Sequence, residues 1–116
     1  SSVSANDFPG LDISGLVSVG KNTEIHKNAK IIGPALIGNN CIIEPDTLIG
    51  PNTTIGDNCH LSACRIENSI VMSNCKITSD VHLKNSIIAF NCQILKKNTL
   101  SHQNTFLLGE GTNITL

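Results

Sequence analysis

The stretch that decides the fold is residues 37–77, which read IGNNCIIEPDTLIGPNTTIGDNCHLSACRIENSIVMSNCKI. Aliphatic residues recur there at a spacing of six, at Ile37, Ile43, Ile49, Ile55 and Leu61. A helix places apolar residues every three or four positions and a half-buried strand every two, so neither explains a period of six. The period therefore indicates a repeat architecture, in which one structural unit recurs along the chain.

The same series extends from this stretch in both directions. It begins at Ile13, keeps steps of six as far as Leu61, and continues to Leu100 with some steps of five. The apolar anchors before and after the quoted stretch are Ile13, Val19, Ile25, Ile31, Leu83, Ile88, Ile94 and Leu100. The repeat is therefore expected to occupy residues 13–100.

Two further positions of each unit are regular. Asn or Asp stands three residues before most anchors, and a small residue stands two before. Asn and Asp tolerate the left-handed backbone region best after Gly, so they mark corners between short strands. Three such units close one coil of a triangular prism, and stacked coils form parallel strands about 4.8 Å apart. The sequence thus predicts an all-β domain of about five coils.

Stacking in threes predicts which residues lie above one another. One face should carry a column of anchors at Ile25, Ile43, Leu61, Ile77 and Ile94. The small-residue column beside it contains four of the five cysteines, and the fifth takes the same slot on a neighbouring face. We interpret the cysteines as small buried hydrophobic residues. A disulfide or metal ladder is the alternative, but parallel side chains point the same way and no CxxC pair occurs.

This pattern resembles the hexapeptide repeat of single-stranded left-handed parallel β-helices. The resemblance implies the left-handed coil, which periodicity alone does not show. We expect residues 1–12 to be a linker or the stump of an upstream domain, residues 13–100 to form the β-helix, and residues 101–116 to be a C-terminal cap. Such a cap would cover unpaired strand edges at the open end of the prism.

Composition excludes several functions. The chain has 116 residues, three Phe, no Trp, no Tyr and a net charge of −1. A single domain is the upper limit at this length. A nucleic-acid surface needs basic stripes and stacking rings, so we expect no nucleic-acid partner. Apolar runs are too short to span a membrane. Residues 1–4 lack the basic and apolar regions of a signal peptide, which favours the cytoplasm.

The quoted stretch and the final residues 107–116, LLGEGTNITL, resemble the C-terminal β-helix of long-form glucose-1-phosphate thymidylyltransferases and related sugar-1-phosphate nucleotidylyltransferases. In that family an N-terminal domain joins a sugar 1-phosphate to a nucleoside triphosphate with the help of Mg²⁺. The resemblance implies that this chain is a non-catalytic fragment for assembly or regulation of such an enzyme, of the dTDP-glucose type.

The same resemblance sets the expected partners. We expect an upstream nucleotidyltransferase domain and a homo-oligomer, with a trimer favoured because trimers are frequent among β-helix proteins. Outward aliphatic residues could supply the contacts between subunits, namely Ile32, Leu36, Ile42 and Leu48. No cofactor is expected in this domain, because Mg²⁺ would belong to the catalytic domain.

The alternative function is that of an acyl-CoA-dependent hexapeptide acetyltransferase acting on an aminosugar phosphate, with acetyl-CoA as cofactor. Such enzymes use a histidine as general base, and the chain offers His26, His60, His82 and His102. His82 and His60 are the candidates under this hypothesis. The pair His82–Leu83 resembles a motif of bifunctional uridyltransferase–acetyltransferases, but the flanking Gly, Tyr and Gly-Asp of that motif are missing.

A zinc site of the carbonic-anhydrase type is also disfavoured. The four histidines are separated by 34, 22 and 20 residues, so no close pair of ligands occurs. Glu44 and Glu67 occupy turn or outward positions and need no function. The sequence therefore indicates no confident catalytic residue and no metal site.

Overall fold

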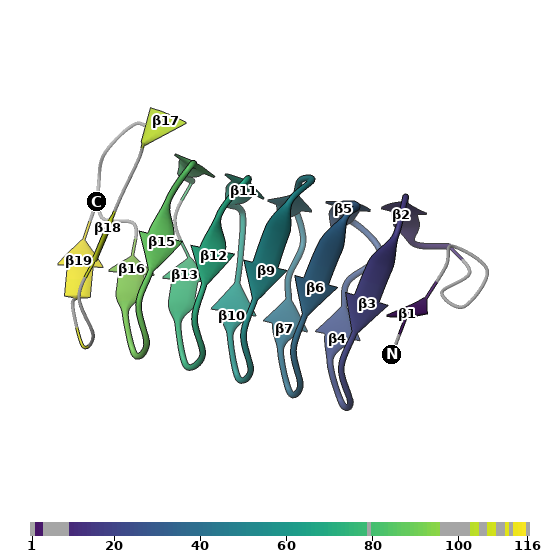
Figure 1. The fold of residues 1–116 in the computed structure, drawn as a ribbon, viewed down its shortest axis with the longest axis horizontal. Helices are drawn as coiled ribbons and strands as arrows, with labels where there is room; N and C mark the ends of the chain where they lie inside the picture. Colours follow the sequence, from purple (N-terminus) through teal and green to yellow (C-terminus); the bar gives the residue numbers. More distant parts are fainter. Residues whose placement is uncertain are drawn as a thin grey trace.

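The computed structural model describes residues 2–3, 10–78, 80–95, 103–104, 107–108, 111 and 113–115. Every regular element in these ranges is a β-strand, and the strands form three sheets, within each of which successive strands stack along one axis (Figure 1). No helix of the described part is long and apolar enough to cross a membrane. The all-β prediction is confirmed.

Each sheet takes every third strand of the chain. Sheet A contains β1 (Ser2–Val3), β3 (Val17–Val19), β6 (Ala35–Ile37), β9 (Thr53–Ile55), β12 (Ile70–Val71), β15 (Ile87–Ile88) and β18 (Leu107–Leu108). Sheet B contains β2 (Asp12–Ser14), β5 (Lys30–Ile32), β8 (Leu48–Ile49), β11 (Arg65–Glu67), β14 (His82–Lys84) and β17 (Gln103–Asn104). Sheet C contains β4 (Glu24–Ile25), β7 (Ile42–Ile43), β10 (His60–Leu61), β13 (Lys76–Thr78), β16 (Gln93–Leu95) and β19 (Asn113–Thr115).

Three consecutive strands, one from each sheet, form a coil, and the strands of successive coils pair in parallel. The predicted anchor column is confirmed, because Ile43 pairs with Ile25 on one side and with Leu61 on the other. The column continues through Ile77 to Ile94. β2 to β16 make the five expected coils, and the architecture is consistent with a left-handed β-helix.

Both ends of the stack carry further strands. The described pieces of residues 101–116 are β17, β18 and β19, which pair in parallel with β14, β15 and β16. Leu83 pairs with Asn104 there, so the last coil is longer than the others. At the other end β1 pairs antiparallel with β3. The predicted domain boundaries at residues 12 and 100 stay a prediction.

The core is a narrow column inside the prism. Apart from Ile25, which is partly buried, the anchors in the described ranges are buried together with most of the small residues that precede them. The largest fully buried side chains are Ile, Leu and Val. No aromatic residue of the described part belongs to this core. The interior is therefore filled by rungs of aliphatic side chains.

The corners adopt the predicted left-handed backbone. Ten described residues other than Gly have positive φ, namely Asn22, Asn40, Asp46, Asn52, Asn58, Ala63, Asn68, Asn74, Asn85 and Asn91. Ala63 is a corner that its residue type did not indicate. Asn28 was expected at a corner but does not have positive φ. The turn there is closed instead by a hydrogen bond from the Ala29 N–H to the His26 carbonyl, at 2.9 Å.

Candidate functional site

The two candidate histidines each pair with a glutamate of the preceding coil. His60 begins β10, and its Nε2 lies 2.7 Å from Oε2 of Glu44, which follows β7. His82 begins β14, and its Nε2 lies 2.6 Å from Oε1 of Glu67 at the end of β11. Both pairs are partly exposed. The structure therefore gives these glutamates a partner that sequence reasoning did not assign.

A carboxylate that holds one imidazole nitrogen orients the ring and leaves the other nitrogen for proton transfer, which is the geometry of an acid–base dyad. The two pairs do not form a common site, because His60 is on sheet C and His82 is on sheet B. His26 is engaged locally, since its Nδ1 accepts the Asn28 N–H at 3.2 Å. His102 lies outside the described residues.

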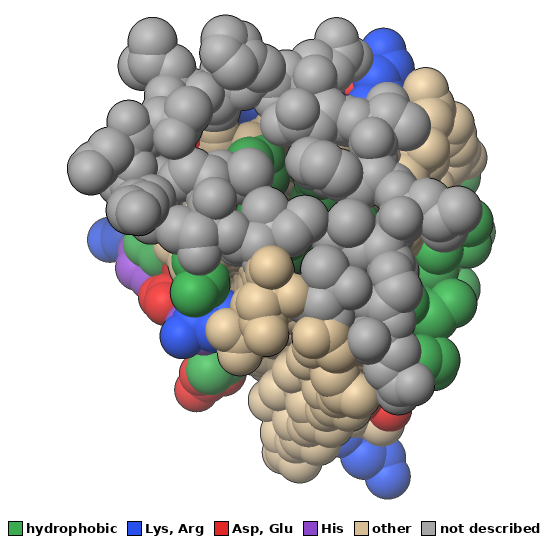
Figure 2. Space-filling model, turned by 90° about the vertical axis from the view of Figure 1, so that its left-hand side faces the viewer, with side chains coloured by type: hydrophobic (Ala, Val, Ile, Leu, Met, Phe, Trp, Pro, Cys, Tyr) green, Lys and Arg blue, Asp and Glu red, His purple; other side chains and the backbone are tan. Residues whose placement is uncertain are grey.

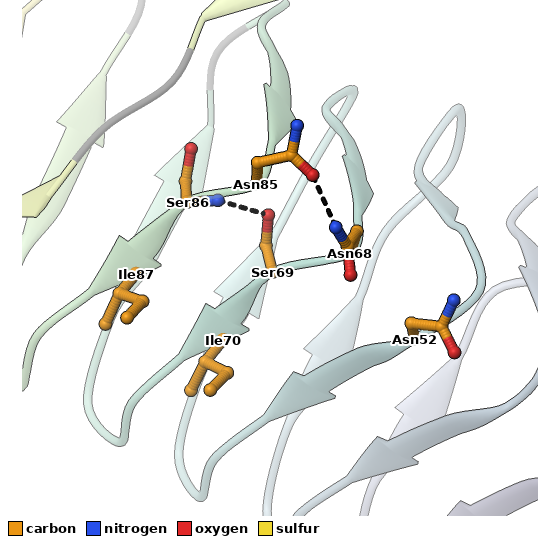
Figure 3. A pocket seen from close by; sticks show the side chains of 7 residues that line it. All are labelled: Asn52, Asn68, Ser69, Ile70, Asn85, Ser86 and Ile87. Atoms are coloured by element: carbon orange, nitrogen blue, oxygen red, sulfur yellow. Dashed lines mark hydrogen bonds between the residues drawn. The ribbon is translucent and has the colours of Figure 1, made fainter.

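Three open hollows lie on the surface of the prism. A hollow of about 280 Å³ is lined by Glu24, Ile25, His26, Ile42, Ile43 and Glu44. Two others, of about 380 and 320 Å³, lie along the edge of sheet A (Figure 3). Neither His60 nor His82 lines any of the three. Glu44 of the His60 pair lines the smallest of these three hollows, whereas neither His82 nor Glu67 lines any of them.

A metal site does not form in the described ranges. No three His, Cys, Asp or Glu side chains there lie close enough together to hold an ion. The sequence predicted that the whole chain lacks a metal site. Because residues such as His102 lie outside the described ranges, that remains a prediction.

The cysteines are structural. All five are free and buried, which confirms the interpretation of these residues as small buried groups. Three of the thiols, those of Cys41, Cys59 and Cys75, donate to backbone carbonyls of the next coil, as from Cys41 Sγ to Gly56 O at 3.0 Å. Contacts with the thiols of Cys41 and Cys75, together with burial, raise the pKa of Cys59. Burial raises the pKa of Cys64 to about 12. Neither Cys59 nor Cys64 is a ready nucleophile, because a thiol reacts as the thiolate.

Sequence reasoning missed the pairing of each histidine with a glutamate. The signal was present, because Glu44 and His60 are 16 positions apart and Glu67 and His82 are 15 apart, close to the length of one coil. Residues separated by about one coil stand on neighbouring strands, where diagonal side chains can meet. Which rotamers bring them together is decided only by the folded surface.

Comparisons with known proteins place the chain in context. The sequence profile of the GMPPB C-terminal domain matches residues 31–115. A solved hexapeptide transferase family protein from Anaplasma phagocytophilum is 20% identical, with 91% of this chain and 75% of that chain covered and a TM-score of 0.36. A putative acetyltransferase from Bacillus cereus is 20% identical, with 90% and 74% covered and a TM-score of 0.37. The TM-scores of these two structures are too low to support an inference about this chain. No curated protein sequence matches the chain.

Proposed function

Because the chain belongs to the family of GMPPB C-terminal domains, within the sugar-1-phosphate nucleotidylyltransferases, we propose that it is the non-catalytic β-helix that assembles or regulates such an enzyme. The profile match over residues 31–115 carries this proposal. The match runs from β5 to the last strand, so it covers the stacked coils themselves. The finer proposal is an enzyme of the dTDP-glucose type, working in the cytoplasm.

The proposed partners follow from that role. Nucleotidyl transfer and Mg²⁺ binding belong to a nucleotidyltransferase domain upstream of residue 1, and this domain itself needs no cofactor. The β-helix joins copies of the enzyme into a homo-oligomer, with a trimer as the order that the sequence favours. Support comes from the three sheets of stacked strands, which give the domain long outer faces.

The test begins with the coding DNA immediately upstream of residue 1. An open reading frame for a nucleotidyltransferase domain supports the proposal, and an in-frame stop codon directly before residue 1 would contradict it. With the complete enzyme, pyrophosphate release is then measured from glucose 1-phosphate with dTTP and with the other nucleoside triphosphates. A preference for dTTP supports the finer proposal, and a preference for another nucleotide overturns that part alone.

Acetyl transfer is the second candidate, favoured by the 2.6 Å contact between His82 and Glu67. Here the ring would act as the general base on an aminosugar phosphate, with acetyl-CoA as donor. The assay follows thiol release from acetyl-CoA with glucosamine 1-phosphate as acceptor, in the native protein and in His82→Ala. His60→Ala is the matched control, because His60 has the same kind of glutamate contact on another sheet. Turnover that only His82→Ala abolishes establishes this function, and absence of turnover excludes it.

A further inference from the structure

One side of the prism carries no charge. Side A consists of residues 16–20, 34–38, 52–56, 68–72 and 85–89, which are the inner strands of sheet A with their adjoining corners. None of these residues is Asp, Glu, Lys, Arg or His. The other two sheets do carry charge, for example at Lys30 and Arg65 of sheet B and at Glu24 and Lys76 of sheet C. Figure 2 shows hydrophobic side chains gathered along the right-hand edge, over the sheet that faces the reader in Figure 1.

An aliphatic ridge runs along side A. Its outward residues stand in one column through strand pairing, namely Leu36, Thr54, Ile70 and Ile87. Leu36 is 54% exposed, Ile70 44% and Ile87 41%. The four outward residues that the sequence suggested as subunit contacts do not form such a ridge. The structure places Leu36 on sheet A, Ile42 on sheet C, and both Ile32 and Leu48 on sheet B.

A groove lies beside the ridge and runs in the same direction. The hollows of about 380 and 320 Å³ share Asn52 and Ile70, so they are parts of one groove. Its far wall is the corner column Asn52, Asn68 and Asn85 (Figure 3). The Asn68 amide donates to Asn85 Oδ1, so these two side chains are held along the axis by each other. The groove therefore lies between an amide wall and the aliphatic side chains of the ridge, with Ser69 and Ser86 between them.

We propose that side A packs face to face against side A of a second copy of this chain, with the ridge of each copy in the groove of the other. The pairing rests on the proposed role in assembly, names its surface, and replaces the trimer that the family resemblance implies with an association of two copies. A ridge beside a parallel groove is complementary to itself under a two-fold rotation, as an isologous interface requires. Packing side A against either charged sheet would bury charges beside aliphatic groups, which is costly.

The spacing of the coils also favours a second copy over other occupants. Side chains of the ridge repeat at the strand spacing of about 4.8 Å. A second prism repeats at the same interval, so the two copies stay in register along the whole side. An α-helix laid along the groove has a pitch of about 5.4 Å and would lose register within a few turns.

The size of side A sets the strength of the pairing. Five strands about 4.8 Å apart and five residues of about 3.3 Å each cover a footprint of roughly 400 Å² per copy. The two copies together then bury about 800 Å², which is less than the roughly 1,200–2,000 Å² of stable interfaces. The pair is therefore expected to be weak and dependent on protein concentration.

Sedimentation velocity of the 116-residue chain over a wide concentration range tests the proposal. We expect the mass to rise towards two chains, and Ile70→Glu to shift this rise to at least tenfold higher concentration. Ile42→Glu is the matched control, because Ile42 is 40% exposed but lies on sheet C. Thr54→Glu is a second ridge variant that replaces a polar, partly exposed side chain and so spares the core. Circular dichroism verifies that each variant is folded.

The outcomes separate this pairing from the proposed function. A three-chain mass would support assembly but overturn the two-fold pairing. Equal effects of Ile42→Glu and the ridge variants would overturn the assignment to side A. A strict monomer at every concentration would overturn the pairing and weaken the assembly role, whereas a nucleotidyltransferase gene upstream would still support the family role.

Discussion

The corner at Ala63 offers a direct test of why this chain is rich in Asn. Ala63 has a φ of 60°, while the nine other non-glycine residues with positive φ in the described part are Asn or Asp. The left-handed region costs a residue with a Cβ about 1–2 kcal/mol, and Asn recovers part of this through local hydrogen bonds. We therefore expect Ala63→Asn to raise the free energy of unfolding by about 0.5–1 kcal/mol.

The surroundings of Ala63 allow the change. Its side chain is only half-buried, and its backbone N–H donates to Thr47 Oγ1 at 3.1 Å, which the substitution leaves in place. For a chain of this size about 1 kcal/mol corresponds to roughly 4 °C in melting temperature. The expected gain is thus about 2–4 °C, which is measurable by thermal denaturation followed by circular dichroism.

The reverse substitution provides the control. Asn40→Ala places Ala at an exposed corner with a φ of 57°, and it should lower the free energy of unfolding by a similar amount. Urea denaturation of both variants, with an unchanged m-value, gives the two differences on one scale. A loss of stability in Ala63→Asn as large as that in Asn40→Ala would refute the reasoning, because corner conformation would then not explain the preference for Asn.

Four further predictions concern the cysteines, a corner glycine and a buried anchor. In native protein at pH 8, fewer than four cysteines should react rapidly with a thiol reagent, because all five are buried. Rapid reaction of four or more would contradict the burial of these side chains. Burial raises the pKa of Cys64 to about 12 from 9.0, so the folded state holds a proton that the unfolded state loses. Stability should therefore fall as pH rises from about 9 towards 12, and Cys64→Ala should flatten this part of the profile measured by urea denaturation. Gly38→Ala should lower the free energy of unfolding by roughly 1–3 kcal/mol, because a Cβ there would lie 2.3 Å from Asp57 Oδ1. An unchanged melting temperature would show that neighbouring atoms move aside without loss of stability. Ile66→Ala, at a fully buried anchor, should lower the free energy of unfolding measured by urea denaturation by about 2–5 kcal/mol. A smaller loss would show that the coil collapses around the cavity.

The core of this protein could be predicted because the coil length fixes the strand register. Ile25, Ile43 and Leu61 are each 18 residues apart, and they pair directly in sheet C. Each of these anchors faces a narrow interior, so an alternative register would expose aliphatic rungs and bury polar residues. The positive φ of Ala63 could not be predicted from its residue type, because hydrogen bonds to the neighbouring coil impose a conformation that Ala does not prefer.

The repeat, the three-sided coil and the burial of the cysteines follow from a period that the residues display directly, while the family follows from the resemblance of residues 37–77 and 107–116 to known β-helices. The arrangement of the outer surface depends on the tertiary structure. The tertiary structure joined His60 to Glu44 and His82 to Glu67, and it brought Leu36, Ile70 and Ile87 into one ridge on an uncharged side. Outward side chains are not confined by packing, so their partners depend on which coil, sheet and corner lie next to them in space.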